Sequence, residues 1–217
     1  MIQSAYRRHV ASPRLIHAYL RDHTVRKVQI GAGAIDKAGW LNTDIEPGKN
    51  EAYLDASRPF PLPGGSFQYV FSEHVIEHLT YEQALAMLKE CHRVLAPGGK
   101  LRIATPNLIR FLDLFQAAKT GEAREYIRRK LEWHELPLTP EPETYILNVE
   151  MRAWGHQFVY TPGMLRASLE AAGFRDVREF GPGVSDDPEL AGVEARANSD
   201  VQDINAYETM VFQAVRR

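Results

Sequence analysis

The segment VQIGAG, followed shortly by LNTD, constrains the fold of this chain more than any other feature. Val25 to Ile30 predicts a first strand that ends in two glycines spaced G-x-G, and Trp40 to Ile45 predicts a second strand. Asp44 follows Gly33 by only 11 residues, whereas about 20 residues separate the glycines from the acid in a dinucleotide-binding loop. This spacing leaves no room for a full helix, so we expect a shortened or irregular connection between the two strands.

The order of the remaining elements predicts an α/β protein. Thr80 and Gln83 form the capping pattern T-x-x-Q, so a helix begins there, and SEHVIEHL (Ser72 to Leu79) is therefore a loop leaving the fourth strand. Strands and helices alternate, which indicates a mostly parallel sheet with ligands beyond the carboxyl ends of its strands. The further strands are predicted at Glu51 to Asp55, Ser66 to Ser72, Lys100 to Ala104, Arg175 to Phe180 and Glu208 to Val215, with a helix capped by Thr161 and ended by Gly173.

Composition excludes several classes of function. The formal net charge of −2 argues against a nucleic-acid binder with a large basic face, and the densest basic stretch, Arg124 to Lys130, is interpreted as a solvated helix face. No apolar run is long enough to span a bilayer. Cys91, the only cysteine, falls in a helical pattern and is expected to be a packing residue. A single cysteine fits the reducing cytosol, so we expect a cytoplasmic protein.

We expect residues 1–217 to form a single domain with two attached parts. Residues 1–24 are predicted to form an N-terminal helical segment, and residues 107–160 a helical insertion after the fifth strand. Within the insertion, Asn107 to Trp133 is predicted to be helical and Leu136 to Thr144 a proline-rich loop. The insertion is rich in aromatic residues, some of which pack a helical cover while others line a pocket beneath a lid. Gly181 to Gly192 is expected to be a polar surface loop that also borders the pocket.

Five motifs, in this order, resemble those of class I S-adenosylmethionine-dependent methyltransferases. They are VQIGAG, LNTDI, LDASRPFPLPGGSFQYVFSEHVIEHL, ECHRVLAPGGKLRIATPN and TPGMLRASLEAAGFRDV. The chain is similar to the small-molecule, type 11-like branch, and to a subgroup with a short first motif that runs into G-W-x-N-x-D. That subgroup looks like predicted methyltransferases often tied to cell-surface glycan or lipid-linked pathways. The resemblance implies a Rossmann-like, mostly parallel seven-stranded sheet with helices on both faces.

The resemblance implies S-adenosylmethionine as the cofactor. This ligand has no phosphate, so the missing third glycine, Asp36 here, removes only what a pyrophosphate needs. Asp44 would accept hydrogen bonds from the ribose hydroxyls, and Ala34 to Gly39 would form a wall around the methionine tail. Asp55 would contact the adenine amino group, although a capping role in the following turn explains it nearly as well. The cofactor residues implied are Gly31, Ala32, Gly33, Asp44, Ile45, Asp55, Ala56, Ser72, Glu73 and His74.

Two histidines are the candidate catalytic residues. His78 ends the motif SEHVIEH, and His156 lies in WGHQFVYT. Either would act as a general base if the acceptor is a hydroxyl, and either is explained as well by a structural role, shaping its loop through hydrogen bonds to the backbone. His74 and His78 are spaced i, i+4, but because they lie in a loop no metal is predicted.

The favoured function is therefore methyl transfer to an oxygen atom of a small-molecule acceptor, with no nucleic-acid partner. The alternatives are a non-catalytic protein that binds S-adenosylmethionine or S-adenosylhomocysteine, and a methyltransferase acting on protein or RNA. A dehydrogenase is a more distant alternative. The sequence leaves the acceptor and the oligomeric state open.

Overall fold

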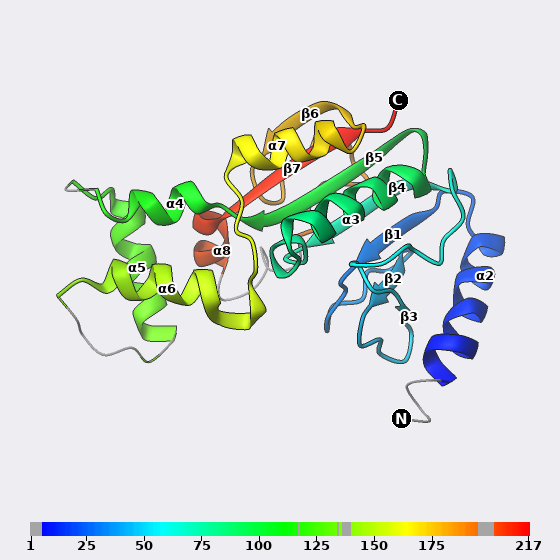
Figure 1. Cartoon of the computed structure of the whole chain (residues 1–217), viewed down its shortest axis with the longest axis horizontal. Helices are drawn as coiled ribbons and strands as arrows, with labels where there is room; N and C mark the ends of the chain where they lie inside the picture. Colours follow the sequence, from blue (N-terminus) through cyan, green and yellow to red (C-terminus); the bar gives the residue numbers. More distant parts are fainter. Residues whose placement is uncertain (1–5, 117, 134, 136–139, 195–201) are drawn as a thin grey trace.

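A seven-stranded sheet forms the centre of the molecule (Figure 1). The computed structural model describes residues 6–116, 118–133, 135, 140–194 and 202–217. The strand order is β3-β2-β1-β4-β5-β7-β6, and β7 alone runs antiparallel to both of its neighbours. The predicted fold class is thus confirmed, with shifted bounds. The strands are β1 (Lys27–Ile30), β2 (Leu41–Asp44), β3 (Ala52–Tyr53), β4 (Phe67–Glu73), β5 (Leu95–Pro106), β6 (Arg175–Phe180) and β7 (Thr209–Val215).

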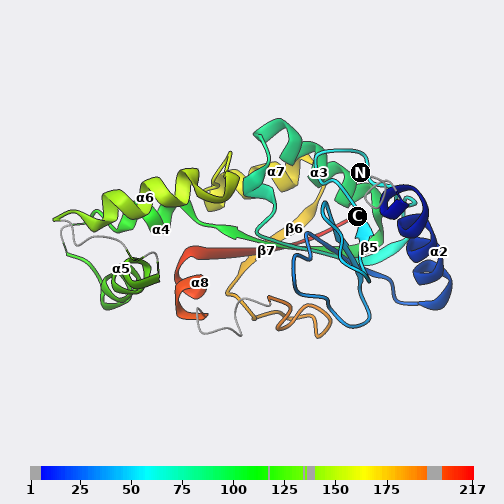
Figure 2. The ribbon, with the colours of Figure 1, turned by 90° about the horizontal axis from the view of Figure 1, so that it is seen from below.

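Two predicted helices cover one face of the sheet (Figure 2). In α3 (Tyr81–Val94) the capping box is present, because the Gln83 amide donates to the Thr80 hydroxyl and the Thr80 amide donates to the Gln83 side chain. In α7 (Pro162–Ala171) the Thr161 hydroxyl accepts from the Met164 amide. Cys91 is fully buried in this layer, as predicted, and burial raises the pKa of its thiol.

The connection between β1 and β2 contains no helix, as its length predicts. The Asn42 side chain closes this loop, because it accepts a hydrogen bond from the Lys37 amide and donates one to the Lys37 carbonyl, at 3.0 and 3.1 Å. The connections from β2 to β3 and from β3 to β4 also lack helices. The chain therefore leaves the carboxyl ends of β1, β2 and β3 through loops that contain no helix.

The segment 181–194 covers the opposite face of the sheet, which corrects its interpretation as a polar surface loop bordering the pocket. Leu190 and Val193 pack with Trp40 and Phe71 in a separate apolar cluster. Polar side chains of the segment are buried as well. Among them, Glu194 forms an ion pair with Arg102 of β5, and both side chains are almost completely buried. None of its residues lines either of the two cavities described below.

Residues 107–160 and α8 form a helical extension at one end of the sheet (Figures 1 and 2). The predicted helix over Asn107 to Trp133 is interrupted, and α6 begins inside the predicted proline-rich loop, of which residues 136–139 lie outside the described part. The helix α8 was not predicted from the sequence. The extension contains α4 (Leu108–Asp113), α5 (Gly121–Trp133), α6 (Pro142–Arg152), the turn η3 (Ala153–Gly155) and α8 (Gln202–Glu208).

Lys130 departs from the predicted solvated face of α5. Its side chain is 5% exposed, and its ammonium group lies 2.6 Å from Glu150 of α6 and 2.8 Å from Glu208 of α8. Arg128, on the same helix, is exposed and forms ion pairs with Glu125 and Glu132. This agrees with the predicted solvated face. The buried lysine therefore joins three helices of the extension.

The N-terminal segment is helical over its described residues. A turn, η1 (Arg7–Ala11), leads into α2 (Ser12–Asp22). Tyr19 attaches this helix to the sheet, because its hydroxyl donates to the Gly39 carbonyl and accepts from the Lys27 amide. Among the residues that the structure describes, no helix has the length and apolar character needed to cross a membrane.

Candidate functional site

A cavity of about 650 Å³ lies at the carboxyl ends of β1, β2 and β4, and we call it the strand-end pocket. It collects residues from the first three of the five motifs. All the sequence-predicted cofactor residues line it except Ser72. These are Gly31, Ala32, Gly33, Asp44, Ile45, Asp55, Ala56, Glu73 and His74, and they are joined by Ala34 and Ile35 of the shortened connection.

The G-x-G turn is shaped for close approach of a ligand to the backbone. Gly31 and Gly33 have φ angles of 72° and 58°, a region that favours glycine. A Cβ on Gly31 would lie 2.2 Å from a methyl carbon of Val75, whereas a Cβ on Gly33 would meet no atom within 4 Å. Gly31 thus accommodates the loop after β4, and Gly33 leaves space on the pocket side.

Carboxylates are placed around this pocket at three strand ends. Asp44 accepts hydrogen bonds from the amides of Gly33 and Glu46, which fixes its carboxylate beside the glycine turn. Asp55 accepts from Ser57 in a turn, so the capping role foreseen for it is present alongside its place in the pocket. Glu73 ends β4. Ser72 does not line the pocket; its side chain is fully buried, and its hydroxyl has no hydrogen-bond partner among the described residues.

A second cavity of about 640 Å³ adjoins the first, and we call it the histidine pocket. The end of β4 and the turn η2 (Ile76–His78) form one side, and the helical extension forms the other. His74 and His78 line both cavities. The lining residues are His74, Glu77, His78, Pro106, Lys130, Trp133, Glu135, Glu150, Trp154, His156, Asn205 and Glu208.

Glu77 is the buried acid of the histidine pocket. Its side chain is fully buried, and its two oxygens accept hydrogen bonds from His74 Nδ1 and Thr105 Oγ1, both at 3.0 Å. Burial acts to raise the pKa of Glu77, but the hydrogen bond and positive charge of His74 outweigh it, so that the pKa is lowered. The carboxylate is therefore held in its ionised form inside the protein.

The structure brings the two predicted catalytic histidines together. The rings of His78 and His156 lie edge to face with centroids 4.8 Å apart. His156 Nδ1 donates to the Glu150 carbonyl at 2.6 Å, and this fixes Nε2 as the nitrogen left to accept a proton or bind a ligand. Burial is the largest influence on His78 and lowers its pKa, so this imidazole is neutral at pH 7.

Backbone strain concentrates around the histidine pocket. Among the described residues, four non-glycine residues have positive φ, and three of them line this cavity, namely His74, Glu135 and Trp154. Each such conformation costs on the order of 1 kcal/mol and persists only when the surroundings impose it. Just after Trp154 the chain is fixed by hydrogen bonds, because the amides of Gln157 and Phe158 both donate to the Glu77 carbonyl. The strained turn at Trp154 thus delivers His156 to the cavity.

Sequence reasoning missed the acids of this pocket. Glu77 stands inside the quoted motif, but its burial depends on η2, a single turn that no periodic pattern announces. Glu150 and Glu208 lie far apart in the chain and meet only through Lys130. Burial and the neighbouring Glu208 raise the pKa of Glu150 to about 7. The basic run Arg124 to Lys130 on α5 was the only sequence feature that pointed to these acids, and Lys130, its last residue, is the one that pairs with them in the interior.

The comparisons with known proteins agree with this geometry. Residues 15–103 match the family described as "Methyltransferase domain". The chain is 49% identical over 51 residues to a probable S-adenosylmethionine-dependent methyltransferase of Mycolicibacterium smegmatis, a match that spans 24% of this chain and 19% of that relative.

Solved structures agree as well. The fold is similar to that of a methyltransferase from Archaeoglobus fulgidus, with a TM-score of 0.52, 19% identity and coverage of 95% and 93% of the two chains. A methyltransferase from Mesorhizobium loti gives a TM-score of 0.50 at 17% identity, with coverage of 94% and 96%.

The chain therefore has the class I S-adenosylmethionine-dependent methyltransferase fold and carries a methyltransferase domain. The strand-end pocket fits the cofactor of this class in two respects. The open space at Gly33 admits a ligand against the backbone, and Asp44 offers a carboxylate to a diol. No phosphate-binding helix N-terminus lies at the glycine turn, as suits a cofactor without phosphate.

Proposed function

We propose that the protein transfers the methyl group of S-adenosylmethionine to an oxygen atom of a small-molecule acceptor. The observation that carries the proposal is the shared wall of the two cavities, formed by His74 and His78. A cofactor held by Asp44 and the glycine turn would face that wall. An acceptor in the histidine pocket would lie on its other side, next to both predicted histidines.

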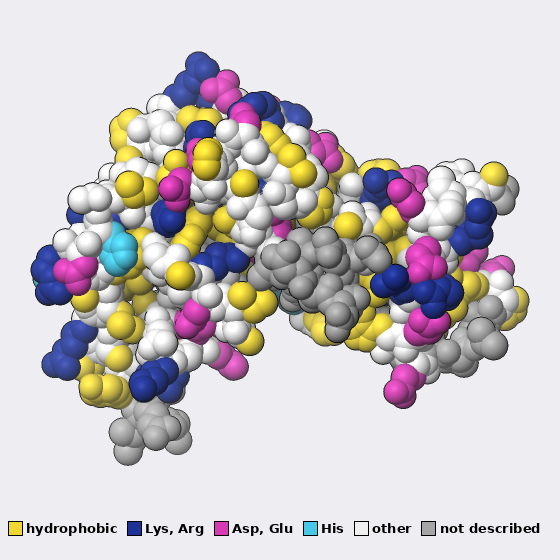
Figure 3. Space-filling view, turned by 180° about the vertical axis from the view of Figure 1, so that it is seen from behind, with side chains coloured by type: hydrophobic (Ala, Val, Ile, Leu, Met, Phe, Trp, Pro, Cys, Tyr) yellow, Lys and Arg dark blue, Asp and Glu magenta, His cyan; other side chains and the backbone are white. Residues whose placement is uncertain are grey.

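The histidine pocket favours a small molecule over a nucleic acid. Its volume falls within the roughly 300–1,000 Å³ of ordinary ligand sites. Its lining includes four carboxylates, those of Glu77, Glu135, Glu150 and Glu208, and one lysine, Lys130, which disfavours a phosphate backbone. On the face seen in Figure 3, acidic and basic side chains are interspersed, with no basic surface for RNA. Trp133 and Trp154 offer apolar rings of the kind that sugars and other ring compounds stack on.

In this mechanism the protein binds the cofactor and the acceptor, orients them toward each other and removes a proton from the acceptor. The bound cofactor supplies a methyl group on a sulfonium, whose carbon–sulfur bond breaks as the new oxygen–carbon bond forms. Asp44 and Asp55 hold the cofactor, and Glu73 lies where a carboxylate offsets a positive charge. His78, or His156 through Nε2, accepts the hydroxyl proton of the acceptor. The helices of residues 107–160 act as the cover that excludes water.

Replacement of Asp44 by alanine tests the cofactor half of the proposal. Loss of a charge-assisted hydrogen bond costs roughly 1.5–3 kcal/mol, so the affinity for S-adenosylhomocysteine should fall by roughly 10- to 150-fold. Isothermal titration calorimetry measures the change. Glu46→Ala is the matched control, because Glu46 is an exposed acid two residues away and outside the pocket. Equal affinities for wild type and Asp44→Ala would remove Asp44 from the site.

Replacement of His78 by alanine tests the catalytic half. Transfer of labelled methyl into the small-molecule fraction of a cell extract should fall by roughly 10²- to 10⁴-fold, the usual contribution of a general base. Binding of S-adenosylhomocysteine should persist. His17→Ala is the control, since His17 is exposed on α2 and away from both cavities. Undiminished transfer by His78→Ala would reject His78 as the base.

The same assay separates the rival functions. A protein that only binds the cofactor would retain S-adenosylhomocysteine but transfer no label to any fraction. A protein or RNA methyltransferase would place the label in macromolecules. A dehydrogenase would bind NAD in preference to S-adenosylhomocysteine. The expectation of a cytoplasmic protein, which rests on the single cysteine, remains part of the proposal.

A further inference from the structure

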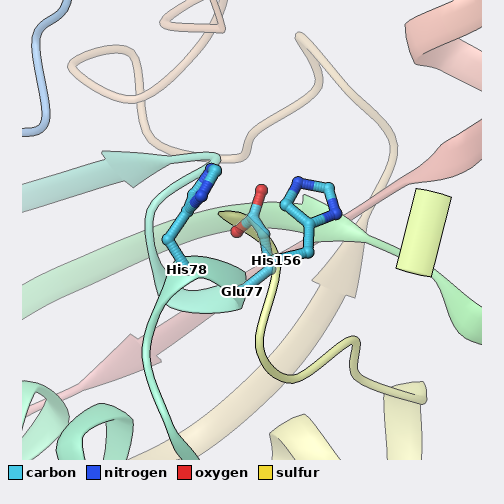
Figure 4. A group of neighbouring side chains, drawn as sticks. All are labelled: Glu77, His78 and His156. Atoms are coloured by element: carbon cyan, nitrogen blue, oxygen red, sulfur yellow. The ribbon is translucent and has the colours of Figure 1, made fainter. Parts of the chain in front are cut away.

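We propose that Glu77, His78 and His156 bind a divalent transition-metal cation in the histidine pocket (Figure 4). The available ligand atoms of the three side chains all lie within 4.8 Å of one another. Figure 4 shows that they project into one common space from two separate segments, the turn η2 and the segment after η3. This proposal replaces the sequence-based expectation of no metal. That expectation considered only the loop with His74 and His78, because the sequence does not show that His156 lies beside it.

The donor set selects the class of cation. Two imidazoles and one carboxylate form the ligand set of catalytic zinc sites and of 2-His-1-carboxylate iron sites. Imidazole nitrogen suits zinc, copper, iron and nickel, whereas Mg²⁺, Ca²⁺ and Mn²⁺ prefer oxygen donors. Three protein ligands leave at least one coordination position open, as in catalytic sites, and all three ligands line the histidine pocket.

Two of the three ligands are already oriented by outer hydrogen bonds. His156 donates Nδ1–H to the Glu150 carbonyl, which leaves Nε2 as the metal-binding nitrogen. The His78 ring is held edge to face against that of His156. A carboxylate has about four acceptor positions, of which Glu77 uses two, toward His74 and Thr105. Outer partners of this kind accompany metal ligands in proteins.

Backbone contacts hold the two ligand segments in register. The Glu77 carbonyl accepts from the amides of Gln157 and Phe158, at 2.7 and 3.1 Å. The Gln157 side chain donates to the His78 carbonyl at 2.6 Å. Both contacts join residues adjacent to the ligands, so the three side chains are positioned by the fold itself. The excess of carboxylates around the cavity further favours a cation.

The site gives the proposed function a more specific chemistry, and in this respect it rests on that function. A cation at this position lies beside His78, in the wall shared by the two cavities. Its open position would take an oxygen or nitrogen donor of the acceptor and hold it toward the strand-end pocket. As a Lewis acid the cation would lower the pKa of a hydroxyl there, so that its proton would be released to solvent when the acceptor binds. His78 and His156 would then act as ligands, in place of the role of base proposed above.

Cobalt and zinc titrations of chelator-treated protein without a histidine tag test the site. CoCl₂ should give visible absorption bands that saturate near one ion per chain, and ZnCl₂ should abolish them, whereas excess MgCl₂ should not. His156→Ala and His78→Ala should each weaken cobalt binding by more than roughly 100-fold, beyond the 10- to 100-fold that loss of an outer partner costs. Far-ultraviolet circular dichroism serves as the check of folding for both variants.

His17→Ala is the matched control and should bind cobalt like the wild type. Wild-type binding no stronger than that of His156→Ala would overturn the metal site, as would an equal loss in His17→Ala. Failure of the two proposals is distinguishable. Cobalt binding without S-adenosylhomocysteine binding would leave the metal site standing and reject the proposed function, and the reverse result would reject the metal site alone.

Discussion

Replacing Glu194 by alanine should lower the free energy of unfolding by about 3–5 kcal/mol, the usual loss when one partner of a buried ion pair is removed. Arg102 and Glu194 are 0% and 1% exposed, and the guanidinium donates to both carboxylate oxygens. Glu194 also accepts from the Gly183 amide at 2.8 Å. Without it, Arg102 would remain buried and charged, and the segment 181–194 would lose its main attachment to the sheet.

Urea denaturation followed by circular dichroism measures this change. Arg217→Ala is the matched control, because Arg217 and Asp176 form an exposed pair, which contributes about 0–1 kcal/mol. The double variant Arg102→Met, Glu194→Leu should recover much of the lost stability, because it leaves no unpaired charge in the interior. A loss in Glu194→Ala no larger than that in Arg217→Ala would show that the pair contributes little.

The sheet was predictable because its signals are local. Alternating apolar runs, the capping box at Thr80 and the cap at Thr161 each depend on a few neighbouring residues, and each is found where it was expected. The 11-residue interval between Gly33 and Asp44 excluded a helix by length alone, and none is present. The covering of the opposite face of the sheet by residues 181–194 was not predictable. This segment is polar in composition, and nothing local indicates that Glu194 forms a buried ion pair with Arg102 of β5.

The two cavities of the candidate site also differ in how far the sequence predicts them. Residues of the strand-end pocket follow directly after predicted strands, so the topology of a parallel sheet brings them together. Ser72 is the exception, since the alternation of β4 directs its side chain into the core. The histidine pocket depends instead on contacts between remote segments, such as His156 with His78. Its acids were hidden because burial of Glu77 or Glu150 is a property of the packed helices.

Replacing Lys130 by methionine should destabilise the helical extension about as much as Glu194→Ala destabilises the sheet. The expected loss in the free energy of unfolding is about 3–5 kcal/mol. The change would leave Glu150 and Glu208 facing each other in a buried site, with the Tyr126 hydroxyl donating to Glu208 as the remaining compensation. Burial acts to lower the pKa of Lys130, but the two carboxylates outweigh it and raise the pKa, so the lysine is charged in the folded protein.

Hydrogen exchange should show where this loss falls. Amides of α5 and α6 should exchange faster in Lys130→Met, while those of β1 and β4 should be little changed. Affinity for S-adenosylhomocysteine should be retained, because no residue of α5 or α6 lines the strand-end pocket. Arg128→Met is the matched control on the same helix, since Arg128 is exposed and its ion pairs contribute little.

Methyl transfer should fall in Lys130→Met even though the cofactor still binds, because α6 and the turn after it carry Glu150 and His156 to the acceptor side. Unchanged transfer together with faster exchange in α5 and α6 would show that the extension does not form the acceptor site. The variant thus separates the half of the molecule that binds the cofactor from the half to which we assign the acceptor.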